Sequence, residues 1–349
     1  MSDLLQTHRL FIGTYTRSTS EGIYSLSLDE KGRLGTPAVA AKAPNPTFLA
    51  LAPGGGILYA VCASPNWLSS FRVDASSAAL TPIDQRPAGK DPTPCHVSVG
   101  HSGRLALAAN YHLGKAAIIP LGPDGMVGTP YVVTHEGKGP NPKRQNQAHV
   151  HSTYFTPDGR RALVCDLGLD KVFSYVIDPA APSLSPAAPP WTRTTPAAGP
   201  RHLAFAPGGK RLFVVNELDC TVVPYGLDAS GALHPGAPAT LLPASYRGDA
   251  TAAEVAVHPN GRFVYGSCRG PDTISVFEAG ERLSPIEIYP CGGKGPRSFA
   301  LSPDGAWLVC AHQDSDSVCS FRVDPRTGTL DRVQGAVSIP MPVCVTFLS

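Results

Sequence analysis

Residues 199–217 read GPRHLAFAPGGKRLFVVNE, and residues 295–313 read GPRSFALSPDGAWLVCAHQ. Each stretch contains an apolar run, a short turn built around Pro and Gly, and a second apolar run. Short apolar runs bounded by such turn residues are typical of buried β-strands. Both stretches therefore predict the same unit, a hairpin whose two strands lie in a core.

This turn recurs along the chain. Its six copies begin at residues 53, 101, 157, 207, 259 and 303, so that they are 44 to 56 residues apart. A third apolar run follows, for example VFSYVID at 172–178 and VCSFRVD at 318–324. No segment shows a sustained helical period. Repeats of several short strands at this spacing are the signature of a β-propeller.

A seventh blade is split between the two ends of the chain. Leu10 to Tyr15 looks like a second strand without its first, and Cys344 to Leu348 looks like a first strand without its second. Pairing them would remove exposed sheet edges, which invite aggregation. We therefore predict an all-β fold, a seven-bladed β-propeller that occupies residues 1–349 as one domain. Pairing of its C-terminal and N-terminal strands closes the ring.

The composition agrees with this fold and argues against several kinds of partner. The chain has 35 Gly and 36 Pro, which suit turns, and 42% hydrophobic residues, which suit a large core. A net charge of +2 gives no field for nucleic acid or an anionic membrane, and neither is an expected partner. The first ten residues lack the apolar core of a signal peptide. Nine cysteines without a C-x-x-C pair indicate buried free thiols, so we expect a cytoplasmic protein.

Counting from the turns predicts which residues meet at one mouth of the central channel. In a propeller the first strand of each blade lines the channel and runs toward the turn, and the second strand runs back. Six residues before the turns stand Thr47, Cys95, His151, Arg201, Ala253 and Arg297. Ten residues after the start of the turns stand Ala63, Tyr111, Leu167, Glu217, Arg269 and Gln313. Asn110, Asp166, Glu254 and His312 lie one position away from these.

This mouth carries more arginine than carboxylate, in a chain with only 16% charged residues. Buried charges are costly unless they are paired or bind a ligand. The planar guanidinium group suits carboxylate or phosphate, because it can bind two oxygens at once. We predict an anion-binding pocket; the alternative is a polar network between blades in which the charges only satisfy one another. The residues predicted to bind substrate are Arg297, His149, Glu254 and Asp166.

His149 and His151 are separated by one residue, so on a regular strand both side chains would point to the same side. Two such histidines could begin a metal site. No third ligand is evident, and the nearby arginines would repel a cation, so we expect no metal ion and no cofactor. The preceding loop, KGPNPKRQNQ at 138–147, is either a solvated connection or a rim that guides anions inward.

The chain resembles a known family at these motifs. HVHS at 149–152, DLGLDKV at 166–172, GPRH at 199–202 and NEL at 216–218 stand at the spacings of the lactonase family of seven-bladed propellers. The resemblance extends over nearly the whole chain. It implies four catalytic residues, His151, Arg201, Glu217 and Arg269. Family members usually carry Ser-Asn before the last arginine, where this chain has Ser267-Cys268.

The family includes bacterial propeller-type 6-phosphogluconolactonases and fungal carboxy-cis,cis-muconate lactonising enzymes. The resemblance therefore implies hydrolysis of a small anionic sugar lactone, in the simplest case 6-phosphogluconolactone. The arginines should keep Glu217 ionised and His151 neutral, which favours His151 as the base and leaves Glu217 as the alternative. A histidine base predicts that activity falls below about pH 6.5. A muconate-lactonising lyase and a non-catalytic propeller that binds a ligand or a protein are the competing hypotheses. Both a monomer and a homo-oligomer are compatible with the sequence.

Overall fold

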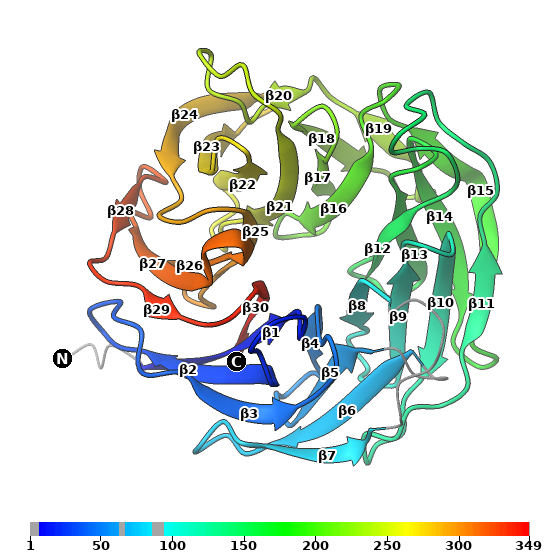
Figure 1. Ribbon diagram of the computed structural model, residues 1–349. Helices are drawn as coiled ribbons and strands as arrows, with labels where there is room; N and C mark the ends of the chain where they lie inside the picture. Colours follow the sequence, from blue (N-terminus) through cyan, green and yellow to red (C-terminus); the bar gives the residue numbers. More distant parts are fainter. Residues whose placement is uncertain (1–6, 63–66, 86–93, 349) are drawn as a thin grey trace.

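The computed structural model describes residues 7–62, 67–85 and 94–348. Within these ranges the strands form seven antiparallel sheets arranged in a ring (Figure 1), which confirms the predicted propeller. The described ranges contain no α-helix, only the 3-10 turn η1 (Gln313–Ser315), and no helix among them is long and apolar enough to cross a membrane. Ala63, one of the positions counted from the turns, lies outside the described residues.

The innermost strand of each sheet lines the central channel. In their order around the ring these strands are β4 (Leu49–Leu51), β8 (His96–Val99), β12 (Val150–Phe155), β16 (Pro200–Phe205), β21 (Thr251–Val257), β25 (Pro296–Leu301) and β30 (Pro342–Leu348). Each contacts the next, and β30 contacts both β25 and β4. The ring is therefore complete.

The other strands follow outward in the same order in every blade. The second strands are β1 (His8–Thr14), β5 (Ile57–Val61), β9 (Leu105–Asn110), β13 (Arg161–Asp166), β17 (Arg211–Asn216), β22 (Phe263–Arg269) and β26 (Trp307–His312). The third strands are β2 (Gly22–Leu28), β6 (Leu68–Val73), β10 (Lys115–Pro120), β14 (Lys171–Asp178), β18 (Thr221–Leu227), β23 (Thr273–Ala279) and β27 (Ser317–Val323). The outermost strands are β3 (Ala38–Lys42), β7 (Leu80–Asp84), β11 (Tyr131–Thr134), β15 (Ser183–Arg193), β19 (Leu233–Pro235), β24 (Leu283–Pro290) and β28 (Leu330–Arg332), with the short β20 (Ala239–Thr240) and β29 (Val337–Ser338) beside the third strands.

The turn between the first and second strands has one geometry in six blades. In the turn at 157–159, the N–H of Gly159 donates to the carbonyl of Thr156, and Gly159 has a φ of 69°. Glycine adopts this left-handed conformation readily because it has no Cβ. The equivalent glycines, with φ between 67° and 75°, are Gly55, Gly103, Gly209, Gly261 and Gly305. A constant turn makes positions counted from it equivalent between blades.

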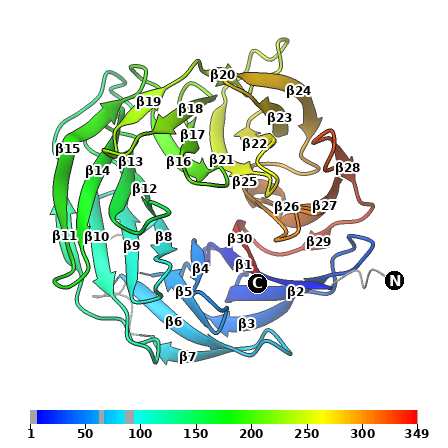
Figure 2. The same ribbon diagram turned by 180° about the vertical axis from the view of Figure 1, so that it is seen from behind.

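The ends of the chain close the ring within one sheet. Strand β30 pairs antiparallel with β1, and Leu10 stands opposite Phe347 while Ile12 stands opposite Val345. The sheet order is β3-β2-β1-β30, with the C-terminal strand innermost. Both views show the two strands side by side (Figures 1 and 2). The predicted closure is confirmed.

The hydrophobic core lies between neighbouring blades. Leu10 and Ile12 pack against Trp307 of the preceding blade, whereas Phe11 between them packs against Leu58 of the following blade. Successive side chains of a strand point to opposite faces, and here both faces are covered. For this reason the second strands of the blades, such as β13 and β17, are nearly continuous apolar runs in the sequence rather than alternating ones.

All nine cysteines lie within the described residues and carry thiols rather than disulfide bonds, and every one except the half-buried Cys95 is buried. Cys165 and Cys310 are members of the apolar clusters between blades. Burial raises the pKa of the Cys165 thiol to about 12, so it stays protonated. A buried thiol of this kind behaves as a small apolar side chain.

Candidate active site

A repeated backbone irregularity marks the predicted positions at the channel mouth. In five blades the pairing of the innermost strand with the second strand shifts, at His151, at Arg201, at residues 253–254, at Arg297 and at Val343. A β-bulge leaves the extra residue unpaired and redirects its side chain. His151 and Arg297 line a pocket at the mouth, and Arg201 lines a smaller cavity deeper in the channel.

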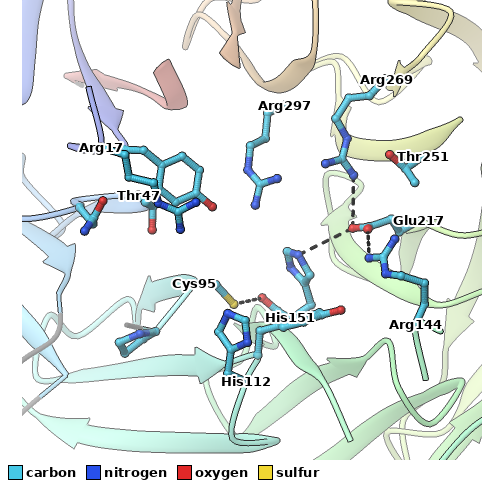
Figure 3. A pocket seen from close by; sticks show the side chains of 14 residues that line it. Arg17, Thr47, Cys95, His112, Arg144, His151, Glu217, Thr251, Arg269 and Arg297 are labelled. Carbon is cyan, nitrogen blue, oxygen red and sulfur yellow. Dashed lines mark hydrogen bonds and ion pairs between the residues drawn. The ribbon is translucent and has the colours of Figure 1, made fainter. Parts of the chain in front are cut away.

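The pocket has a volume of about 470 Å³, a size that suits a small metabolite. Segments from all around the ring contribute to it, and Figure 3 shows them converging. The lining residues are Tyr15, Arg17, Asn45, Thr47, Pro94, Cys95, Tyr111, His112, Arg144, His151, Glu217, Thr251, Arg269 and Arg297. Four of them are arginines and one is a glutamate, so the lining carries an excess of positive charge.

Glu217 is the carboxylate on which three arginines converge. It follows β17 directly, and its Oε2 lies 3.0 Å from Nε of Arg201 and 3.4 Å from Nη2 of Arg269. Its Oε1 accepts a hydrogen bond from Nη2 of Arg144 at 2.5 Å. Burial by itself would raise the pKa of Glu217, but Arg269, Arg201 and Arg144 outweigh it and lower the pKa to about 2. Glu217 is therefore ionised at neutral pH.

His151 stands beside this carboxylate. Its Nε2 lies 3.9 Å from Oε2 of Glu217, whereas its Nδ1 is buried and has no hydrogen-bond partner among the described residues. Burial, followed by the charges of Arg201, His202 and Arg297, lowers the pKa of His151 well below its ordinary value. The imidazole is consequently neutral near pH 7, although a carboxylate lies nearby.

Arg201 is almost fully buried and does not line the main pocket. Its Nε donates to Glu217, and its Nη1 donates to the carbonyl of Ala253 in the next blade. It shares the deeper cavity with His151 and Arg297. Arg201 thus holds Glu217 from behind, while Arg269, the last residue of β22, approaches the same carboxylate from the pocket.

The structure does not bring His149 and Asp166 to the pocket. His149 precedes β12 and stacks on the ring of Tyr111 at 4.2 Å, with its Nδ1 3.0 Å from the carbonyl of Tyr111. Asp166 is fully buried, accepts hydrogen bonds from the N–H groups of His149 and Leu169, and pairs with His135 at 2.7 Å. The rings of His149 and His151 both contact Tyr111, but His151, which stands at the bulge, lines the pocket and His149 does not.

Glu254 faces another part of the channel. Its Oε1 lies 2.9 Å from Nδ1 of His202, and it lines the channel toward the turn end rather than the pocket at the mouth. Burial raises its pKa to about 7, against the opposing effect of Arg201 and Arg297. The structure therefore separates Glu254 from the group around Glu217, although the two residues are linked through Arg201.

Counting from the turns missed Tyr15 because the split blade has no such turn. Tyr15 is nevertheless the equivalent of Glu217. The N–H of Tyr15 donates to the carbonyl of Met341, just as the N–H of Glu217 donates to that of Gly199. The sequence indicates the basic loop at 138–147 as a possible rim but does not single out Arg144 within it. No pattern in the sequence identifies Arg17, Asn45 or Thr251 as pocket residues.

Among the described residues, no group of three His, Cys, Asp or Glu side chains is placed to hold a metal ion. The polar groups of the site are instead arginines, a carboxylate, a neutral imidazole and hydroxyls. This set can bind an anion, polarise a carbonyl oxygen and accept a proton from water.

The chain matches the family model described as "Lactonase, 7-bladed beta-propeller" over residues 9–347. It therefore belongs to this lactonase family, as the motifs indicated. A 6-phosphogluconolactonase of Bacillus subtilis (strain 168) is 34% identical to it over 346 residues, with 97% of each chain covered.

Solved structures show the same relationship. A periplasmic gluconolactonase of Pseudomonas aeruginosa superposes with a TM-score of 0.90 at 30% identity, over 99% of both chains. A protein from Lactobacillus plantarum superposes with a TM-score of 0.91 at 32% identity, over 99% of this chain and all of its own. The name of the Bacillus protein specifies a phosphorylated gluconolactone, and the name of the Pseudomonas protein does not.

Proposed function

We propose that this protein hydrolyses a sugar lactone that carries an anionic group, with 6-phosphogluconolactone as the first candidate. The observation that carries the proposal is the pocket itself, in which four arginines and an ionised glutamate surround a neutral histidine. The name of the Bacillus relative, which is similar over nearly its whole length, supports the phosphorylated substrate.

His151 serves as the base in this proposal, and Glu217 orients it. A pKa of about 2 makes Glu217 a poor proton acceptor, whereas neutral imidazole accepts a proton readily. Water attacks the lactone carbonyl carbon as His151 takes one of its protons. The carboxylate of Glu217, 3.9 Å from Nε2, then stabilises the imidazolium ion that forms.

Arg269 stabilises the oxyanion. Burial lowers its pKa to about 10, so it stays charged at neutral pH and lies at the pocket side of Glu217. When the tetrahedral intermediate collapses, the bond between the carbonyl carbon and the ring oxygen breaks. The ring oxygen takes the proton from His151, and the product is the open-chain hydroxy acid. Arg201 positions Glu217 throughout, since it is buried behind it.

Of the remaining predicted residues, Arg297 contacts the substrate in this proposal and the other three have indirect roles. His149 supports the ring of Tyr111 at the pocket wall, and Asp166 holds the backbone of His149. Glu254 supports His202, which stands 5.1 Å from His151 ring to ring. Arg297 binds the anionic group of the substrate.

The test is a lactone panel with the purified protein. Hydrolysis of 6-phosphogluconolactone, gluconolactone and a lactone with a distal carboxylate is measured against the buffer background, because lactones open spontaneously. The proposal expects a rate above background that His151→Ala removes. A protein that adds nothing to the background for any lactone would instead be the non-catalytic propeller. Ring closure of a carboxylated muconate would identify the lyase.

A further inference from the structure

Two arginines of the pocket stand on the same aromatic ring. The guanidinium carbon of Arg17 lies 4.4 Å from the centre of the Tyr15 ring, and that of Arg297 lies 5.7 Å from it. Arg17 belongs to the loop between β1 and β2, and Arg297 is the bulged residue of β25. Residues from the first and last parts of the chain thus meet at Tyr15.

These two arginines differ from the others in having no carboxylate partner. Among the residues that the structure describes, neither Arg17 nor Arg297 makes an ion pair or a hydrogen bond, whereas Arg144, Arg201 and Arg269 all contact Glu217. In Figure 3, Arg17 and Glu217 stand on opposite sides of the pocket, with Arg297 between them. The pocket therefore has a neutralised side and a side with uncompensated positive charge.

The backbone around Tyr15 is fastened on both sides. The N–H of Thr16 donates to Oδ1 of Asn45 at 3.0 Å, and the N–H of Asn45 donates to Oγ1 of Thr16 at 3.1 Å. The N–H of Tyr15 donates to the carbonyl of Met341 at 3.1 Å. These bonds fix the backbone that carries the Tyr15 ring before any ligand binds, which reduces the entropy lost on binding.

We propose that Tyr15, Arg17 and Arg297 form an anion clamp for the phosphate monoester of the substrate, opposite the end of the pocket that opens the lactone. The inference rests on the proposed lactone hydrolysis and specifies its substrate class. A phosphate monoester carries close to two negative charges at neutral pH, which matches two unpaired guanidinium groups better than a single carboxylate does. The lactone ring then extends from the clamp toward His151 and Glu217.

Occupation of the clamp also affects the base. The charge of Arg297 is one of the causes that lower the pKa of His151, after burial and after Arg201 and His202. A phosphate dianion beside Arg297 offsets that charge and raises the pKa of His151 toward the range of an effective base. Compared with an unphosphorylated lactone, a phosphorylated lactone should therefore have a higher kcat as well as a lower KM.

The experiment compares phosphorylated with unphosphorylated ligands in four forms of the protein. These are the wild type, Arg17→Gln, Arg297→Gln and the control Arg326→Gln, whose side chain is 86% exposed far from the pocket lining. One readout is the ratio of kcat/KM for 6-phosphogluconolactone to that for gluconolactone. The second is calorimetric binding of 6-phosphogluconate and of gluconate, which requires no catalysis. Melting curves establish that each variant is folded.

The clamp predicts that the wild type prefers the phosphorylated ligand in both readouts. Each clamp variant should lose about 10- to 100-fold of that preference, the scale for a hydrogen bond between charged groups, and Arg326→Gln should keep it. If the wild type opens no lactone but binds 6-phosphogluconate through Arg17, the proposed hydrolysis fails and the clamp stands. Equal use of both lactones by the wild type, or an unchanged preference in both variants, would overturn the clamp.

Discussion

Nε2 of His151 lies 3.9 Å from Oε2 of Glu217, in contact with a carboxylate and yet neutral near pH 7. Burial, with the charges of Arg201, His202 and Arg297, keeps the imidazole neutral. The charge of Glu217 is in turn offset by its own ion pairs with Arg144, Arg201 and Arg269. The two side chains are thus set for different tasks. The histidine can take a proton, and the glutamate can stabilise the charge that results.

This relationship predicts the ranking of two variants. His151→Ala should lower kcat by about 10²- to 10⁴-fold, the range for loss of a general base. Glu217→Gln should lower it less, because the base remains and only its electrostatic partner is weakened. Steady-state rates on 6-phosphogluconolactone, corrected for spontaneous opening, measure both effects. A larger loss for Glu217→Gln would assign the base to Glu217.

The pH profile should differ from that of an ordinary histidine base. A base must be unprotonated, so activity is lost as pH falls through its pKa, and the pKa of His151 is lowered well below 6.5. Burial, Arg201, Arg297 and the neighbouring His202 and His96 all act in this direction. The acid limb of kcat/KM, which reports the free enzyme, should therefore lie well below pH 6.5.

The limb in kcat provides the check within the same experiment. The acid limb of kcat reports the enzyme–substrate complex, in which the substrate phosphate offsets the charge of Arg297. With 6-phosphogluconolactone, this limb should lie at higher pH than the acid limb of kcat/KM. Gluconolactone, which carries no phosphate, serves as the control. An acid limb at or above pH 6.5 in kcat/KM would contradict the electrostatic environment described for His151.

The roles of two arginines can be separated experimentally. Arg269→Ala removes a donor at the pocket and should lower kcat by about 10²- to 10³-fold with little change in melting temperature. Arg201→Ala leaves Glu217 buried beside an empty space and frees the carbonyl of Ala253. Breaking a buried pair from one side typically costs about 3–5 kcal/mol, so Arg201→Ala should also lower the thermal stability. Equal melting temperatures of the two variants would argue against the buried position of Arg201.

The fold could be predicted almost completely from the sequence, because one turn with a left-handed glycine repeats in six blades. Because the turn is constant, residues at a fixed number of positions from it lie at the same channel mouth. This relationship predicts His151, Glu217 and three arginines as neighbours. Tyr15 escaped the count, since the split blade has no turn between its first and second strands. Its equivalence to Glu217 is visible only in the backbone hydrogen bond to Met341.

Other parts of the site depend on features that leave no pattern in the sequence. Asp166 and His149 have the polarity of binding residues, yet the chain uses them to secure its own backbone and the wall of the pocket. Arg144 reaches Glu217 from a loop that is held by hydrogen bonds from Gln145 to the carbonyl of Leu167 and to Asp170. The cytoplasmic location inferred from the cysteines stays a prediction.

Glu254 offers a test of the buried electrostatics that is independent of catalysis. Burial raises its pKa to about 7 from 4.5, so the folded protein holds a proton there that the unfolded chain releases. Stability from this group is fully present below pH 4.5 and is lost as pH rises toward 7. Glu254→Gln, which carries no charge, should therefore stabilise the protein relative to the wild type above pH 7, by about 1–3 kcal/mol. Denaturant unfolding at pH 5 and pH 8 measures the difference, which should be smaller at pH 5; the opposite trend would mean that Glu254 is ionised when folded.

The closure of the ring predicts that the last strand stabilises the whole propeller. Deletion of residues 344–349 removes most of β30, including the buried Val345 and Phe347, and exposes the edge of β1 along the channel. Burial of each such side chain contributes about 1.5–3 kcal/mol, and the deletion removes several at once. The truncated protein should melt at least about 10 °C lower than the full chain or fail to fold.

Two further samples identify the cause of that loss. Phe347→Ala keeps the strand pairing and should cost about 3–5 kcal/mol, less than the deletion. A synthetic peptide with the sequence of residues 342–349 should raise the melting temperature of the truncated protein, because β1 offers it the same antiparallel partner. A truncated protein that melts with the full chain would show that pairing of β1 with β30 is dispensable, and that the six blades with intact turns hold the ring without it.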